Sequence, residues 1–219
     1  MINAGNAESA RDKYIAFIPG ELGAEKLTGA RVKTREIDIS GVKIGGGRPI
    51  VLIAGPCVIE SQKHCTDVAR AIKDATSGMQ IPFIFKASFD KANRSAGDSF
   101  RGVGMKEGLK ILGAIKRELG IPVLTDVHEP GQCDEVAEFV DVLQIPAFLC
   151  RQTDLLVAAG KTGKVVNVKK GQFLAPGDMR NVVDKIRATD SEEIMLTERG
   201  TSFGYHYLVN DMRALPVMP

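Results

Sequence analysis

Residues 121–145 read IPVLTDVHEPGQCDEVAEFVDVLQI, and much of the chain repeats their pattern. The apolar run Val123–Thr125 is followed by polar residues, then by an amphipathic segment at Gln132–Phe139 and a second apolar run at Val142–Ile145. Short apolar runs that alternate with amphipathic helices are typical of a parallel sheet covered by helices. This stretch therefore predicts a strand–helix–strand unit with the polar residues Asp126–Glu129 at the end of its first strand.

The same unit recurs on both sides of this stretch, which gives six predicted strands in all. The further strands are Ile50–Ala54, Phe83–Phe85, Val165–Val168 and Ile194–Leu196, and the further helices are Gln62–Ala75, Met105–Leu119, Gln152–Ala159 and Pro176–Arg187. Six strands suit either an open doubly wound sheet or part of a (βα)8 barrel, which has about 250 residues. All six end in polar or charged clusters, and ligands bind at the carboxyl ends of parallel strands. A barrel mouth therefore fits better than a single crevice.

The segment before the barrel has a different pattern. Residues 1 to about 30 show no clean period and are interpreted as an extension. Ile37 and Ile39, then Val42 and Ile44, alternate on either side of Gly41, which predicts a β-hairpin that covers the N-terminal end of the barrel. We therefore divide the chain into an extension with a hairpin at residues 1–48 and an α/β barrel of TIM type at residues 49–219, with about six of eight βα units.

Composition excludes several classes of protein. The 219 residues have a net charge of +2, no Trp and 5% aromatic residues, which argues against a surface for nucleic acid. No apolar run approaches the roughly 18 residues of a membrane span, and the N-terminus lacks a signal-peptide pattern, so a cytoplasmic protein is expected. The four cysteines, Cys57, Cys65, Cys133 and Cys150, show no metal-binding spacing and are expected as thiols.

Positive charge gathers in one predicted strand-to-helix loop, between Lys86 and Ser95. A solvated basic loop would explain this group alone. Arg151, Lys169 and Arg199, however, follow three other predicted strands. Cations that converge from several strand ends suit phosphorylated, multiply anionic substrates. The chain lacks the GxxxxGK[ST] pattern, so a nucleotide P-loop is excluded.

Six motifs in register carry a resemblance to a known family. They are Ala54–Ser61, Lys86–Ser95, Leu124–Glu129, Gln144–Asp154, Val166–Phe173 and Thr197–Thr201. In this order, over residues 50–217, the chain resembles the 3-deoxy-D-manno-octulosonate 8-phosphate synthases. The related 3-deoxy-D-arabino-heptulosonate 7-phosphate synthases carry a Lys-Pro-Arg-Thr type segment where this chain has Lys91–Ser95. Asn93 therefore implies arabinose 5-phosphate and not erythrose 4-phosphate as the second substrate.

The resemblance implies an aldol-like condensation of phosphoenolpyruvate with arabinose 5-phosphate and water, which gives 3-deoxy-D-manno-octulosonate 8-phosphate and phosphate. It also implies a homotetramer that serves lipopolysaccharide synthesis. The alternatives are the heptulosonate reaction and an inactive fragment that only binds phosphorylated ligands. The residues that the resemblance assigns are Lys91, Asp126 and Asn93 for catalysis, Lys86, Arg94, Ser95, Gln144, Arg151, Lys169, Gln172 and Arg199 for substrate binding, and Cys57 for a metal ion.

Cys57 implies the metal-dependent branch of the family, with a divalent ion of the Zn, Fe or Mn class. The resemblance places the other metal ligands, and strands seven and eight, beyond Pro219. We therefore expect these 219 residues to bind divalent metal weakly and to show no measurable condensation. If metal bound tightly, His128 and His206 would be the first further ligands to examine, and His64 is a weaker candidate.

Overall fold

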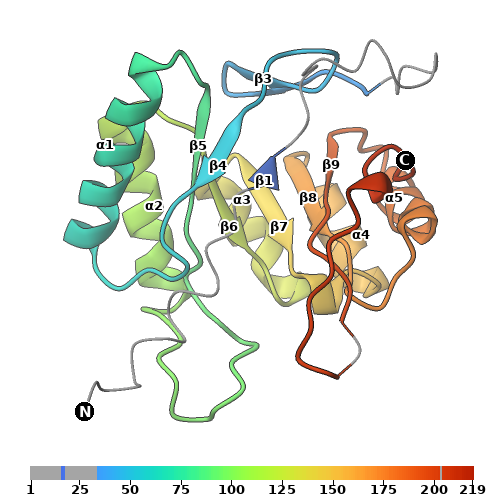
Figure 1. The fold of residues 1–219 in the computed structure, drawn as a ribbon. Helices are drawn as coiled ribbons and strands as arrows, with labels where there is room; N and C mark the ends of the chain where they lie inside the picture. Colours follow the sequence, from blue (N-terminus) through green and yellow to red (C-terminus); the bar gives the residue numbers. More distant parts are fainter. Residues whose placement is uncertain (1–15, 18–33, 203) are drawn as a thin grey trace.

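The computed structural model describes residues 16–17, 34–202 and 204–219 (Figure 1). One sheet has the strand order β1-β4-β5-β6-β7-β8-β9, and β2 and β3 form a separate hairpin. The strands are β1 (Ala16–Phe17), β2 (Ile37–Ile39), β3 (Val42–Ile44), β4 (Leu52–Ala54), β5 (Phe83–Lys86), β6 (Val123–Asp126), β7 (Val142–Ile145), β8 (Val165–Lys169) and β9 (Ile194–Thr197). The helices are α1 (Gln62–Gly78), α2 (Met105–Leu119), α3 (Cys133–Phe139), α4 (Thr153–Lys161) and α5 (Met179–Arg187).

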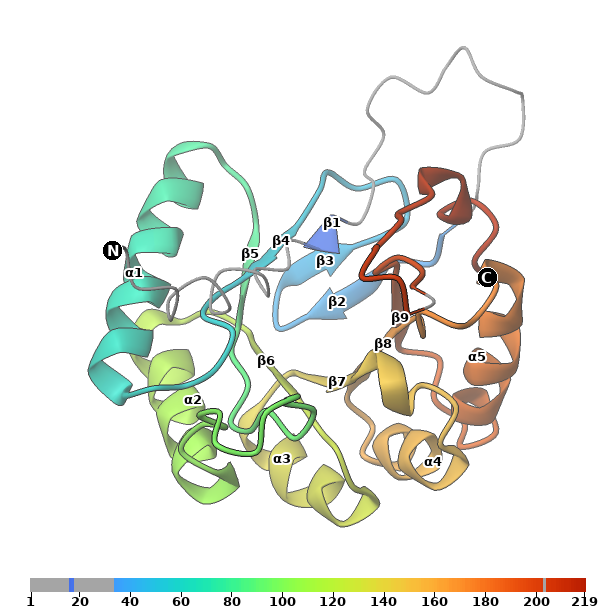
Figure 2. The ribbon, with the colours of Figure 1, turned by 60° about the horizontal axis from the view of Figure 1, so that its bottom comes forward.

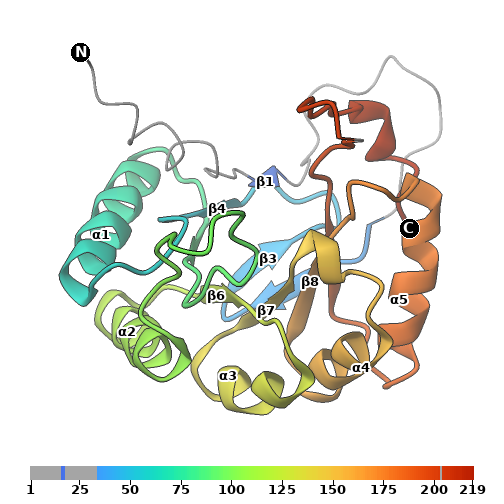
Figure 3. The same cartoon turned by 90° about the horizontal axis from the view of Figure 1, so that it is seen from below.

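Strands β4 to β9 are parallel to one another and follow one another in chain order. Figures 2 and 3 show that they curl into a half-barrel with the helices on its outer side. The predicted incomplete barrel of about six βα units with an N-terminal hairpin is therefore confirmed, with six parallel strands and five α-helices in the described residues. The helix predicted at Pro176–Arg187 begins with a 3₁₀ turn at Pro176–Asp178. The helix predicted at Gln132–Phe139 begins at Cys133, after a 3₁₀ turn at Pro130–Gln132.

The sequence did not predict strand β1. Ala16 and Phe17 pair antiparallel with Ile53 and Leu52 at the edge of the sheet. A two-residue strand has no periodicity of its own to detect, and its pairing depends on a partner far along the chain. The rest of the predicted extension, up to residue 33, lies outside the described residues.

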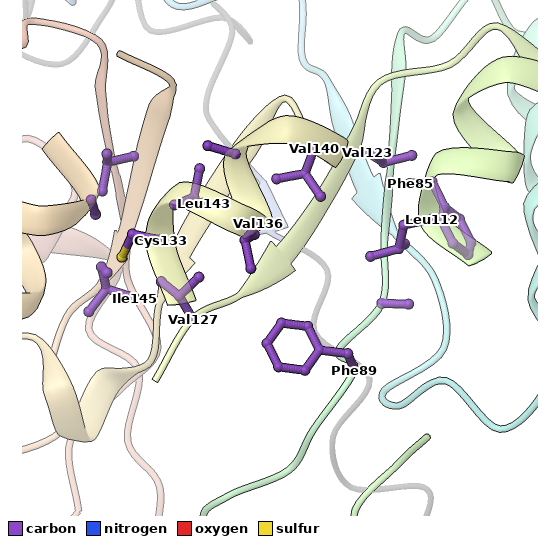
Figure 4. Close-up of a cluster of buried hydrophobic side chains, with 14 of the residues drawn as sticks. Phe85, Phe89, Leu112, Val123, Val127, Cys133, Val136, Val140, Leu143 and Ile145 are labelled. Carbon is purple, nitrogen blue, oxygen red and sulfur yellow. The ribbon is translucent and has the colours of Figure 1, made fainter. Parts of the chain in front are cut away.

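Alternate side chains of the parallel strands face opposite sides, because successive residues of a strand point to opposite faces. The outward set packs against the helices as the main core. Figure 4 shows this layer, with Phe85 and Val123 near Leu112 of α2, and Leu143 near Val136 of α3. Apart from the buried hydroxyl of Thr125, the outward positions are filled by hydrocarbon, so apolar contacts hold the sheet to its helices.

The inward set begins with a second, smaller core at the amino ends of the strands. Ile37, Ile39 and Ile44 of the hairpin pack there against one residue from each barrel strand. These strand residues are Ile53, Ile84, Leu124, Val142, Val165 and Met195. The hairpin therefore closes the N-terminal end of the half-barrel, and in Figure 1 it lies opposite the long loops that follow β5 and β9.

The turn of the hairpin is tied to the barrel. Ser40 and Gly41 have φ values of 50° and 92°, as a tight two-residue turn requires. The Ser40 hydroxyl donates to Asp141 Oδ1 at 2.5 Å, and Lys116 Nζ donates to the same oxygen at 2.8 Å. The other oxygen of Asp141 accepts from the Val123 amide at 2.9 Å. A buried carboxylate thus joins the hairpin, α2 and the start of β6.

Candidate functional site

Polar side chains occupy the next inward positions, nearer the carboxyl ends of the strands than the smaller core. Two residues beyond Ile84, Leu124, Val142, Val165 and Met195, on the same face, lie Lys86, Asp126, Gln144, Asn167 and Thr197. The register pairs Asp126 with Gln144 and Gln144 with Asn167, so these three lie side by side across β6, β7 and β8. Strand alternation therefore places a layer of polar side chains on the carboxyl-end side of the smaller apolar core.

Hydrogen bonds join the members of this layer in a row. Gln144 Nε2 donates to Asp126 Oδ1 at 2.5 Å, and its Oε1 accepts from Asn167 Nδ2 at 3.1 Å. Asn167 Oδ1 in turn accepts from the Thr197 hydroxyl at 2.8 Å. Each amide uses its donor toward one neighbour and its acceptor toward the other. The row fixes the orientation of the Asp126 carboxylate.

Two ammonium groups approach Asp126 from the β5 side. Lys86 and Lys91 each donate to the Ser88 hydroxyl at 2.9 Å, and that hydroxyl donates to Asp126 Oδ2. The two Nζ atoms lie 3.5 and 3.6 Å from the same oxygen. Asp126, Ser88 and Lys91 are all buried. Ser88 thus links both lysines to one carboxylate.

The electrostatics of the cluster are mutually dependent. Burial alone would raise the pKa of Asp126, but Lys86, Lys169 and Lys91 hold it well below its usual value. Burial lowers the pKa of Lys86 to about 7, and the repulsion from Lys91 and Lys169 adds to this while Asp126 opposes it. Burial likewise lowers the pKa of Lys169, with Lys91 and Arg199 acting in the same direction. Asp126 is therefore ionised at neutral pH, whereas Lys86 is close to its titration midpoint.

Cys57 also lies at the carboxyl end of a barrel strand, in the loop after β4. Its thiol is half-buried and acts electrostatically on both Lys86 and Lys169. Gly55 explains how the chain after β4 comes so close, because a Cβ there would lie 2.1 Å from the Lys86 carbonyl oxygen. The loop that carries Cys57 is also held by the Ile59 amide, which donates to the Ser88 carbonyl at 2.9 Å.

The remaining predicted site residues lie farther out. Asn93 and Ser95 are exposed and Arg94 is half-buried, on the loop after β5. Arg151 is exposed after β7, where its carbonyl accepts from Lys185 Nζ at 3.0 Å. Gln172 is half-buried after β8, and its carbonyl accepts from the Ser202 amide at 3.4 Å. The structure thus separates the predicted residues into a buried group around Asp126 and an outer rim.

Three members of the buried network were missing from the predicted site, namely Ser88, Asn167 and Thr197. A signal for two of them was present. Asn167 stands two residues before Lys169 and Thr197 two residues after Met195, so strand alternation places both on the inward face. Ser88 also stands two residues after an inward residue, Lys86, but it lies beyond the end of β5, where strand alternation no longer predicts the direction of a side chain.

The described residues do not by themselves fit a metal ion. Within residues 34–202 and 204–219, no group of three or more His, Cys, Asp or Glu side chains is arranged to hold one. His128 packs edge-on against Phe89 with ring centroids 5.8 Å apart, and burial lowers its pKa. Cys57 is thus a predicted ligand without a ligand set around it. Among the helices of these described residues, none is both long and apolar enough to cross a bilayer.

Comparison with known proteins gives a consistent result. Residues 27–219 match the model of the DAHP synthetase I family. The chain is 62% identical over 185 residues to the 2-dehydro-3-deoxyphosphooctonate aldolase of Citrifermentans bemidjiense, a match that covers 84% of this chain and 68% of the relative. A protein of the same name from Geobacter metallireducens is 61% identical with the same coverage. One from Nitrobacter winogradskyi is 58% identical over 83% of this chain and 63% of its own length.

Proposed function

Because the chain belongs to the DAHP synthetase I family, we propose that its strand-end cluster is the phosphoenolpyruvate site of an octulosonate-type synthase. The proposed reaction condenses phosphoenolpyruvate with arabinose 5-phosphate and water and releases phosphate. Two observations favour this reaction over the heptulosonate one. The relatives carry the octonate name, and Asn93 stands where the heptulosonate-type segment has Pro.

The observation that carries the proposal is the excess of positive charge, buried or partly buried, around the Asp126 carboxylate. Lys86, Lys91 and Lys169 act on this carboxylate, and Arg199 acts on Lys169. Four cations and one carboxylate leave a net charge of +3 when all are ionised. Buried charges of one sign are costly unless a ligand compensates them. Phosphoenolpyruvate, with a phosphate and a carboxylate, supplies compensating charge in a compact form.

The chemistry follows from positioning and charge stabilisation. C3 of the enol phosphate attacks the aldehyde carbon, water adds at C2, and the C–O bond to phosphate breaks. Lys86, Lys169, Arg151 and Arg199 are proposed to hold the phosphate and carboxylate of phosphoenolpyruvate, where fixed cations stabilise the charge that develops. Asp126 is ionised, so it acts as a hydrogen-bond acceptor and counter-charge and not as a proton donor.

The pentose phosphate is assigned to the outer loop after β5. Asn93, Arg94 and Ser95 lie toward solvent there, and Lys91 reaches back to Ser88 in the buried layer. Lys91 is thus proposed to lie between the two substrates. Gln144 and Gln172 are proposed to contribute hydrogen bonds at the inner side and at the rim.

Cys57 is proposed as one ligand of a divalent ion, whose contribution when bound would be to activate water or polarise the aldehyde. No step is derived through this ion, because the described residues do not complete its ligand set. We further propose that the protein assembles as a homotetramer whose product enters lipopolysaccharide synthesis. Light scattering on the purified protein tests the assembly.

Calorimetric titration with phosphoenolpyruvate tests the binding part of the proposal. Lys169→Met should weaken binding by about tenfold or more, since a charge-assisted contact is lost. Lys164→Met is the matched control, because Lys164 precedes the same strand at its other end. Equal affinities for the wild type and Lys169→Met would contradict the proposed site.

Phosphate release tests the reaction itself. Release that depends on arabinose 5-phosphate supports the proposal, and faster release with erythrose 4-phosphate would assign the heptulosonate reaction instead. Binding of phosphoenolpyruvate without release with either sugar would favour the binding-only alternative for these 219 residues. The assay is run with and without added divalent metal, so that a metal requirement is detected.

A further inference from the structure

A second buried lysine lies directly beside the cluster but faces away from it. Lys170 follows the last residue of β8 and is 1% exposed. Lys169 belongs to the inward set, and the next residue along the chain has the opposite direction. The Lys170 amide still donates to the Thr197 carbonyl at 2.9 Å, so its backbone is held to β9. Nothing in the proposed chemistry uses its ammonium group.

That ammonium group joins two loops from inside. Its Nζ donates to the carbonyls of Gly171 and Leu174, both at 3.2 Å, in the loop after β8. It also donates to the Gly200 carbonyl at 3.4 Å, in the loop after β9, and lies 3.6 Å from Glu198 Oε1. The same carboxylate oxygen of Glu198 accepts from the Gly200 amide at 2.5 Å. One charge pair thus fixes the backbone of both loops.

The β9 loop has little freedom at this point. Gly200 has a φ of +84°, and a Cβ there would lie 2.7 Å from Asn210 Oδ1 and 2.8 Å from Leu208 Cδ1. The backbone of Gly200 is therefore enclosed by Leu208 and Asn210, and it is also held by Lys170 and Glu198. Replacing a buried ion pair with hydrocarbon is often neutral for stability, so this pair needs a reason other than folding energy.

We propose that Lys170 and Glu198 form a brace that positions Lys169 and Arg199 for phosphoenolpyruvate. The inference rests on the proposed function. Lys170 is the chain neighbour of Lys169, and Glu198 is the chain neighbour of Arg199. Neighbouring Cα atoms are about 3.8 Å apart, so a shift of either brace residue is passed directly to a substrate-binding cation. Lys170 and Glu198 are positioning residues and do not contact the substrate.

The test measures phosphoenolpyruvate affinity in Lys170→Met by calorimetry, with circular dichroism to confirm that the variant is folded. A misplaced binding group costs about 10- to 100-fold, and a loss in this range is expected. Lys73→Met is the matched control, because Lys73 also donates to a backbone carbonyl, that of Leu119 at 2.6 Å, but between α1 and α2. The control should keep wild-type affinity.

A coupling measurement separates positioning from a general loss of structure. In a Lys169→Met/Arg199→Met background the cations that the brace positions are gone, so adding Lys170→Met should change the remaining affinity by less than about threefold. An equal loss in both backgrounds would overturn the proposal. So would wild-type affinity in a folded Lys170→Met.

Two further variants cover the case in which Lys170→Met does not fold. Glu198→Gln keeps the size of the side chain and removes the counter-charge of Lys170, whereas Lys170→Met/Glu198→Gln removes both charges and leaves none unpaired. Reduced affinity in both, with coupling to Lys169 and Arg199, supports the brace, and unchanged affinity in both overturns it. If the wild type itself does not bind phosphoenolpyruvate, the proposed function fails. A failure of the brace alone leaves wild-type binding intact.

Discussion

The carboxylate of Asp126 has two opposite effects, one on folding and one on anion binding. It compensates the buried ammonium groups of Lys86 and Lys91, and it also repels an incoming anion. In Asp126→Asn we therefore expect the free energy of unfolding to fall by about 3–5 kcal/mol, as when one partner of a buried ion pair is removed. We also expect inorganic phosphate to bind more tightly. Urea unfolding and calorimetry at pH 7 measure the two effects.

The pH dependence checks the cause of the stability loss. The pKa of Asp126 in the folded protein lies well below 3.8, so its stabilisation is present above that pH and is lost as the pH falls through the folded value. The difference in stability between wild type and Asp126→Asn should therefore shrink below about pH 4. Asp74→Asn, on an exposed position of α1, is the control of equal charge change. A difference that persisted in acid would point to lost packing instead.

Lys86 gives a prediction near neutral pH. Its pKa is about 7 in the absence of ligand, and a bound anion favours the charged form. Above pH 7 the protein must take up a proton when phosphoenolpyruvate binds, so the affinity should fall by up to about tenfold per pH unit. The substrate phosphate does not obscure this, because phosphate monoesters ionise with a second pKa of about 6.

Lys86→Arg is the matched variant for this effect, because an arginine remains charged over this range. Its affinity for phosphoenolpyruvate should be nearly independent of pH from 7 to 9. Titrations in buffers of different ionisation enthalpy count the protons taken up. Wild-type binding without proton uptake at pH 8 would show that Lys86 is already charged or does not contact the ligand.

Some of the neighbours within the site could be predicted from the sequence, and others could not. Lys86, Asp126 and Lys169 were predictable as neighbours, because each ends a strand of one parallel sheet. The role of Ser88 was not, since a hydroxyl that links two lysines to a carboxylate depends on the loop path. Lys169 and Lys170 look equivalent in sequence, yet one faces the mouth and the other is buried between two loops.

At the scale of elements, α2 approaches the loop after β5 at a glycine. A Cβ on Gly108 would lie 2.4 Å from the Cβ of Phe89 and 3.4 Å from Ile59 Cδ1. Gly108→Ala should gain up to about 1 kcal/mol in helix propensity and lose about 1–3 kcal/mol to overpacking. We therefore expect a net loss of stability in urea unfolding, and weaker phosphoenolpyruvate binding because Phe89 precedes Lys91 by two residues.

Gly78→Ala provides the control within a helix. Gly78 ends α1 and has open space where a Cβ would stand. Its replacement should leave stability unchanged or slightly raised. If Gly108→Ala were equally well tolerated, the contact between α2 and the β5 loop would be looser than the structure shows.

Element prediction succeeded where a local pattern existed. The bounds of α2 and β7 were predicted to the residue, because apolar spacing and the flanking Gly or Pro define both ends. The 3₁₀ turn at Pro176–Asp178 was predicted as part of a helix, since proline suits the first turn of either. Of the turn at Pro130–Gln132, only Gln132 was included in a predicted helix. Strand β1 could not be predicted, because its only determinant is the exposed edge of β4.

At the scale of the whole molecule, Cys57 leads to a prediction about the affinity for divalent metal. Cys57 is one thiol, and tight zinc sites need three or four ligands. We expect Zn²⁺ and Mn²⁺ to bind weakly in calorimetry, and Cys57→Ser to change that binding little. Tight binding of one ion per chain would contradict this prediction. It would mean that Cys57 has further ligands that are not grouped around it in the structure, and His128 would be the first to test.

The hairpin that closes the amino end of the half-barrel has a consequence for the speed of encounter. Hydrocarbon from Ile37, Ile39 and Ile44 lies beneath the cations, so their field lines spread mainly toward the open mouth. Phosphoenolpyruvate, which carries about three negative charges at neutral pH, is then attracted toward the cluster before it makes any contact. Its association rate should fall steeply as salt shortens the Debye length to about 10 Å at 0.1 M. Its rate of escape should respond far less, because the contacts it leaves are screened from solvent by the protein itself.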